Sequence, residues 1–123
     1  MGTFIFGNQG QANAVYRAKV PAGIQSKAAL LDALSDALCF PDYFGGNWDA
    51  LDECIRDLSW LPGGDVMLSH EDLPLSQDFA SLSTYLSILK DAVEKWNATG
   101  ERQLRVVFPP QTESIVERVL SDR

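Results

Sequence analysis

Three short, largely apolar runs alternate along this chain with longer segments whose apolar residues recur at helical spacing. The runs cover residues 14–20, 65–69 and 104–108. Strands separated by helices long enough to cross over are typical of a parallel sheet with right-handed connections. The sequence therefore predicts an α/β fold built on a small three-stranded parallel sheet with packed helices. We expect one face of so small a sheet to stay relatively uncovered unless the terminal segments pack on it.

Four segments are predicted to be helices. The first follows Ser26, a candidate N-cap, and must end before Pro41, since the residue ahead of a proline avoids helical geometry. The second begins after Asn47, whose side chain can also cap a helix. The third spans residues 79–96 and the last spans residues 112–120. We interpret residues 1–123 as one domain with a core of about 14–108, an extra N-terminal segment and a C-terminal helix.

The composition excludes several classes of site and location. The sequence contains no run of roughly 18 apolar residues, so we expect no membrane span. The first residues do not have the pattern of a signal peptide. Two cysteines, Cys39 and Cys54, are too few for a disulfide framework, and we expect a reduced, buried pair in a cytoplasmic protein. His70, the only histidine, is expected on the surface or in a loop. We predict no metal site and no cofactor.

The negative charge of the chain is concentrated in its middle third. The net charge is −7, yet the segment from Asp42 to Asp78 holds nine acids and a single base, Arg56. A cluster of one sign attracts a positively charged partner, whereas binding to phosphate requires a basic surface. The sequence therefore indicates a basic protein, or the basic cleft of a nucleic-acid enzyme, and no direct contact with nucleic acid.

The second predicted helix separates its apolar and charged residues onto two sides. Its apolar face consists of Trp48, Leu51, Ile55 and Leu58, and its opposite face consists of Asp49, Asp52, Glu53, Arg56 and Asp57. Like charges one turn apart repel by a few tenths of a kcal/mol, and this helix contains two such pairs, 49/53 and 53/57. A helix that keeps such repulsion between acids on its charged face favours a binding role for that face.

Residues 40–55 carry a specific pattern without gaps. Thirteen of its 16 positions match the pattern: Phe40, Pro41, Asp42, Tyr43, Phe44, Gly45, Asn47, Asp49, Ala50, Leu51, Glu53, Cys54 and Ile55. In these residues the chain resembles the barstar family, intracellular inhibitors of barnase-type ribonucleases. The likeness in the order of strands and helices extends over about residues 14–108.

The resemblance implies a mode of action. Members of the family lay an acidic second helix and the preceding loop into the nuclease active site, where carboxylates take the place of RNA phosphates. Asp49 then matches the central phosphate-mimicking carboxylate, and Glu53 matches the strongest acid of the family, usually Asp. Tyr43 matches an aromatic residue that packs on the partner, and we expect it to point outward.

Further residues are assigned to the partner-binding site by the same resemblance. Gly45 and Asn47 match loop residues that shape the approach, and Asp91 matches a further acid on the later helix. Three positions depart from the family: Asp52 stands where the family has Trp, Gly46 replaces an acid, and Arg56 adds a positive charge to the same face. Changes at the rim are what specificity between related partners requires.

Three functions are compatible with these residues. The first is a monomeric, cytoplasmic inhibitor, or immunity protein, of a barnase-type ribonuclease. The alternative is a barstar-like binding module for a different basic protein or toxin. A third hypothesis, an enzyme using Asp49 and Glu53 as paired carboxylates, is disfavoured because such acids need different environments and these two share one wet face. We therefore expect a binding protein that is not an enzyme.

Overall fold

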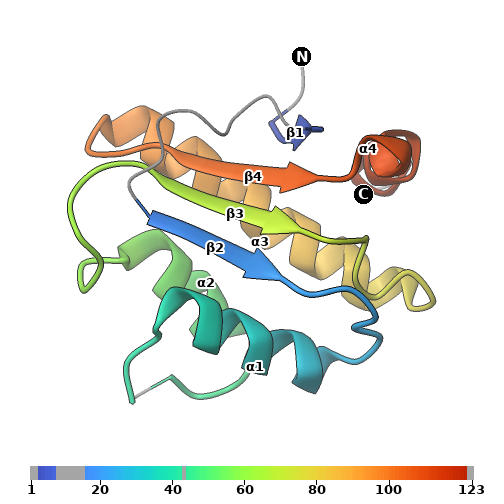
Figure 1. Cartoon of the computed structure of the whole chain (residues 1–123), viewed down its shortest axis with the longest axis horizontal. Helices are drawn as coiled ribbons and strands as arrows, with labels where there is room; N and C mark the ends of the chain where they lie inside the picture. Colours follow the sequence, from blue (N-terminus) through green and yellow to red (C-terminus); the bar gives the residue numbers. More distant parts are fainter. Residues whose placement is uncertain (1–2, 8–15, 43, 122–123) are drawn as a thin grey trace.

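The chain folds into a parallel four-stranded sheet with helices, in strand order β1-β4-β3-β2 (Figure 1). A computed structural model describes residues 3–7, 16–42 and 44–121. The elements are β1 (Ile5–Phe6), β2 (Tyr16–Val20), α1 (Lys27–Leu38), α2 (Trp48–Asp57), β3 (Val66–His70), α3 (Phe79–Thr99), β4 (Leu104–Phe108), the 3-10 helix η1 (Pro110–Thr112) and α4 (Glu113–Ser121). The predicted α/β class, its three strands and its four helices are confirmed.

A fourth strand, β1, extends the predicted sheet at its β4 edge. Ile5 pairs with Val107, and Phe6 pairs with Phe108. The ring of Phe4 packs edge-on against Phe108 at 5.4 Å between centroids, so the strand is held by aromatic packing as well as by backbone pairing. The extra N-terminal segment therefore contributes an edge strand to the sheet.

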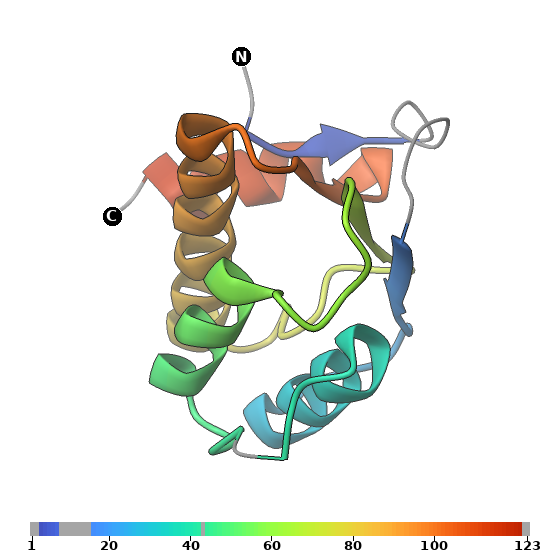
Figure 2. The same cartoon turned by 90° about the vertical axis from the view of Figure 1, so that its left-hand side faces the viewer.

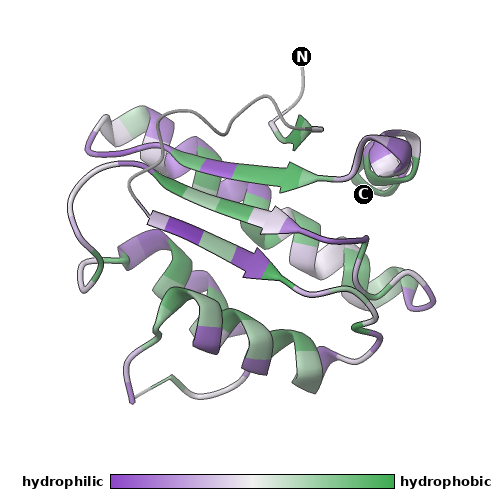
Figure 3. Ribbon diagram, viewed as in Figure 1, coloured by the Kyte–Doolittle hydropathy of each residue, from purple (hydrophilic) through white to green (hydrophobic). Residues whose placement is uncertain are grey.

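Helices α1, α2 and α3 lie on one side of the sheet (Figures 1 and 2). Their apolar side chains form the core with the inward residues of the strands, among them Val20, Leu68 and Val106. Polar and apolar residues alternate along β2 (Figure 3), as expected for a strand with one covered face. Exposed Arg17 and Lys19 belong to the opposite face, which α1, α2 and α3 do not cover.

The predicted helix starts are confirmed at their caps. The Ser26 side chain accepts the Ala29 N–H at 3.1 Å, and the Asn47 Oδ1 accepts the Ala50 N–H at 2.7 Å. Both cap residues have extended backbone, as N-caps require. The second cap fixes where the acidic helix α2 begins.

The prediction for His70 was wrong. Strand β3 runs to residue 70, so the alternation of the strand places His70 on the inward face with Val66 and Leu68, and only 6% of it is exposed. Its ring stacks on Phe108 at 4.1 Å between centroids. Burial lowers the pKa of His70 from 6.5 to about 4.

The prediction of two buried cysteines was wrong for Cys39. Cys54 is buried on the inner side of α2, but Cys39 is exposed. It ends α1 in the left-handed conformation, with φ of 55°, and its Sγ lies 3.3 Å from the Tyr16 Oη at the rim of the core. Both cysteines are free thiols.

Candidate functional site

An aromatic cluster anchors the loop that leads into α2. Phe40 is buried and packs on Phe44 at 4.8 Å and edge-on against Trp60 at 6.0 Å. Trp60 donates its Nε1 hydrogen to the Leu38 carbonyl at 2.8 Å, and both Phe44 and Trp60 pack against the core. Trp60 therefore supports the loop from the core side. Tyr43, the predicted outward aromatic residue, lies outside the described residues.

The turn before α2 is fixed by its backbone. Gly46 has φ of 71°, a conformation that side chains rarely adopt, and Asn47 then caps the first turn. Gly45 is exposed, and a Cβ added there would lie 3.7 Å from the Asn47 Nδ2, an ordinary contact. Asp49 follows in the first turn, where the helix dipole favours a negative charge.

Helix α2 buries its predicted inner face and turns its acids to solvent. Leu51, Cys54 and Ile55 are buried, and Trp48 is half-buried against the core. The outer residues Asp49, Glu53 and Asp57 are exposed and lie one turn apart in sequence. Within the described part of the chain, none of these three carboxylates makes an ion pair or a side-chain hydrogen bond. The face therefore presents a row of uncompensated negative charges.

Arg56 lies on the same face but is paired within the helix. Its Nη2 lies 2.9 Å from the Asp52 Oδ2, and its Nε donates to the Asp52 carbonyl at 3.4 Å. A shallow hollow of about 360 Å³ lies next to this pair, lined by Glu53, Cys54, Arg56 and Asp57. Arg56, the one base of the acidic segment, thus forms its ion pair with Asp52.

Helix α3 holds the last turn of α2 in place. Lys95 donates from Nζ to the Arg56 carbonyl at 2.7 Å, and Trp96 donates from Nε1 to the Ile55 carbonyl at 3.1 Å. These two contacts satisfy carbonyls that the end of a helix leaves without partners. Asp91 is exposed one turn before Lys95, so it lies toward the side of α3 that meets α2.

The roles of Lys95 and Trp96 in holding α2 were not predicted. The predicted third helix reaches residue 96, and Trp96 is buried in it. No pattern in the sequence indicates that its indole reaches a carbonyl of another helix, because that contact depends on how α2 and α3 pack.

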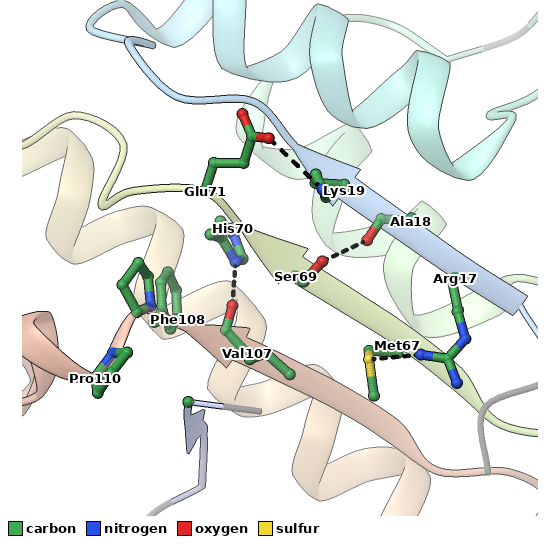
Figure 4. A pocket seen from close by; sticks show the side chains of 12 residues that line it. Arg17, Ala18, Lys19, Met67, Ser69, His70, Glu71, Val107, Phe108 and Pro110 are labelled. Carbon is green, nitrogen blue, oxygen red and sulfur yellow. Dashed lines mark hydrogen bonds and ion pairs between the residues drawn. The ribbon is translucent and has the colours of Figure 1, made fainter. Parts of the chain in front are cut away.

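A second, larger hollow lies on the sheet face away from these helices (Figure 4). It has a volume of about 580 Å³ and is lined by residues of β2, β3 and β4. Lys19 pairs with Glu71 at 3.6 Å, and Ser69 donates to the Ala18 carbonyl at 3.3 Å. Arg17 lies 3.7 Å from the Met67 Sδ. Each of these polar side chains already has a partner within the protein, and none of the predicted site residues that the structure describes lines this hollow.

The described residues were also searched for metal sites and for membrane-spanning helices. Among them, no group of three or more His, Cys, Asp or Glu side chains could hold a metal ion. No helix in the same part of the chain is both long and apolar enough to pass through a bilayer. The predicted residues that the structure brings together are Asn47, Asp49, Asp52, Glu53 and Arg56, on α2 and its cap.

Comparison with known proteins identifies the family of this chain. The family model described as Barstar (barnase inhibitor) matches residues 20–109. The match runs from the end of β2 to just beyond β4 and contains the loop, α2 and the supporting part of α3. A search of curated proteins gave no match.

Proposed function

Because this chain belongs to the barstar family, we propose that it inhibits a barnase-type ribonuclease by covering its active site with α2 and the preceding loop. The observation that carries this proposal is the pair Asp49 and Glu53. Both are exposed on a helix capped at its start and tied down at its end, and neither is ion-paired within the described residues. Rigid carboxylates of this kind can replace the phosphates of RNA in a cationic cleft.

The remaining site residues surround this pair. We assign Gly45 and Asn47 to the loop that approaches the enzyme, and Tyr43 to an aromatic contact with it. Asp91, toward the α2 side of α3, adds a further carboxylate at the edge of the face. Asp52 and Arg56 lie on the outer side of α2 and set the local charge pattern.

The charge distribution supports a basic partner. Nine acids and one base lie between Asp42 and Asp78, while the other residues nearly balance. A field of this sign accelerates the encounter with a basic protein and is weakened by salt. It also opposes direct binding to nucleic acid. We propose that the protein acts as a monomeric immunity protein in the cytoplasm.

We propose that the protein is a binding protein and not an enzyme. Asp49 and Glu53 lie on the same exposed face, so nothing in their surroundings separates a general acid from a general base. The larger hollow on the sheet face contains neither of them.

One observation favours the alternative, a barstar-like module for another basic protein. The charged pair of Asp52 and Arg56 occupies the face at a position where the family has an aromatic residue. A changed rim of this kind alters which partner fits. The alternative differs from the first proposal only in the identity of the target.

The test is titration calorimetry with a panel of purified barnase-type ribonucleases at low salt, together with an RNA-cleavage assay. We expect a 1:1 complex with at least one member, inhibition at the same stoichiometry, and weaker binding as salt is raised. Absence of binding to every nuclease would contradict the ribonuclease proposal. Capture of a basic non-nuclease protein through the same face would then support the alternative.

A further inference from the structure

Arg56 could pair with either of two acids on its own helix. Asp52 lies four residues before it and Glu53 lies three residues before it, and both spacings bring side chains together on a helix surface. The guanidinium is on Asp52, at 2.9 Å, with a second contact to the Asp52 carbonyl. Glu53, which we propose to be a principal contact with the nuclease, is left without an ion pair in the described chain.

The alternative position of the arginine is open. Glu53, Arg56 and Asp57 line the shallow hollow beside the pair, so there is space on the Glu53 side of the arginine. The arginine side chain is 44% exposed, and an exposed ion pair of this kind is weak. The guanidinium can therefore reach Glu53 once the Asp52 carboxylate is removed, so its position depends on which carboxylates are present.

We infer that Asp52 is a positioning residue that holds Arg56 away from Glu53 and so keeps the Glu53 carboxylate available to the partner. This inference rests on the proposed function. It assigns to the pair of Asp52 and Arg56 a role in affinity without requiring either side chain to touch the nuclease. The partner that fits has cations opposite Asp49 and Glu53, and a surface opposite the internally paired Asp52 and Arg56 that does not need a negative charge.

The first test needs no partner. The side-chain nitrogen signals of Arg56 are recorded by NMR in the native protein and in Asp52→Ala, each with and without Glu53→Gln. We expect Glu53→Gln to leave the Arg56 signals unchanged in the native protein and to shift them in Asp52→Ala, because the guanidinium has moved to Glu53. Signals that respond equally to Glu53→Gln in both backgrounds would overturn the inference, even if a nuclease binds.

The second test is a double-mutant cycle on affinity for a nuclease that binds the native protein. Arg56→Gln should change Kd by less than about 3-fold in the native background, since the arginine is already paired with Asp52. In Asp52→Ala it should improve Kd by about 10-fold, because it removes the cation that had moved to Glu53. A charge effect without repositioning would make Arg56→Gln equally favourable in both backgrounds, and this result would overturn the inference.

The matched control is Asp57→Ala, which removes one acid from the same helix face. Asp57 makes no ion pair within the described chain, so Asp57→Ala and Arg56→Gln should be additive. Coupling of Arg56 to Asp57 as strong as its coupling to Asp52 would argue against a specific role for Asp52. Failure of every nuclease to bind would remove the proposed function and with it this role of Asp52, whereas the NMR result stands independently.

Discussion

The buried imidazole of His70 accepts a hydrogen bond from Tyr85, with 2.7 Å between its Nε2 and the Tyr85 Oη. Its other nitrogen, Nδ1, lies 2.9 Å from the Val107 carbonyl oxygen, which can only accept. Nδ1 therefore carries the proton, and the hydroxyl of Tyr85 donates to Nε2. This arrangement links β3, β4 and α3 through one neutral ring whose two nitrogens are both satisfied.

The burial of His70 predicts that the protein loses stability in mild acid. The pKa of His70 is lowered from 6.5 to about 4 by desolvation, so the unfolded chain takes up a proton at a higher pH than the folded chain. The contribution of His70 to stability is therefore complete above pH 6.5, is lost as the pH falls from 6.5 to 4, and does not change further below pH 4. The expected loss is about 3 kcal/mol in the free energy of unfolding, measured by denaturant titration across this range.

His70→Gln is the control for this effect. The amide can still donate to the Val107 carbonyl and accept from Tyr85, but it does not titrate. The pKa values of the Asp65 and Asp78 carboxyls are lowered by hydrogen bonds from Gln103 and Ser81, so these acids titrate below the window. An equally steep decline between pH 6.5 and 4 in His70→Gln would show that another group causes it.

Removing the hydroxyl of Tyr85 should destabilise the fold at neutral pH. Tyr85→Phe leaves the ring in place but deprives the buried His70 Nε2 of its donor, which costs about 1–3 kcal/mol. The measurement is the free energy of unfolding at pH 7. Tyr16→Phe is a comparison at a half-buried site, where the lost hydroxyl donates to the Ala37 carbonyl and water can replace it, so a smaller loss is expected. An equal loss in the two variants would contradict this account.

The periodicity of apolar residues predicted most of the fold, because strands, helices and helix caps depend on residues that are close together in the sequence. The three principal strands, the four helices and the caps at Ser26 and Asn47 all follow from spacing and from residues with known end preferences. The acidic outer face of α2 was predicted in the same way, since one helix places its own residues on fixed sides.

The features that were missed depend on packing between distant segments. His70 was assigned to the surface because a lone histidine after a short run gives no sign that β3 continues to include it. Its partners, Val107 and Tyr85, come from other elements. The pairing of Arg56 with Asp52 was equally hidden, because Glu53 is as close in sequence and only the side-chain geometry decides between them.

The cap of α2 predicts a variant that affects both stability and binding. Asn47→Ala removes the acceptor for the Ala50 N–H and should cost about 1 kcal/mol of stability. Affinity for the nuclease should also fall, because the first turn that carries Asp49 becomes less ordered. Unfolding titrations and calorimetry measure the two effects.

Ser26→Ala is the matched control, since it removes the equivalent cap of α1. It should cost a similar amount of stability and leave affinity unchanged, because α1 carries none of the residues assigned to the partner-binding face. Equal effects of the two variants on affinity would show that general stability, and not the order of α2, limits binding.

Replacement of Asp49 and Glu53 should separate binding from folding. If each carboxylate is buried against a nuclease cation, Asp49→Ala and Glu53→Ala should each weaken the complex by about 3–5 kcal/mol in calorimetry. Both side chains are exposed in the free protein, so the melting temperature should hardly change. Asp49→Ala should destabilise slightly through the lost dipole interaction, whereas Glu53→Ala relieves repulsion from Asp49 and Asp57.

The control for net charge is Glu117→Ala, which removes one exposed acid from α4. It should slow association slightly through the weaker overall field and leave the dissociation rate unchanged. The Asp49 and Glu53 variants should instead dissociate faster, because each removes an ion pair that forms only within the complex. Equal, small effects of all three variants would mean that the acids act only through long-range attraction, and that the partner binds elsewhere on the molecule.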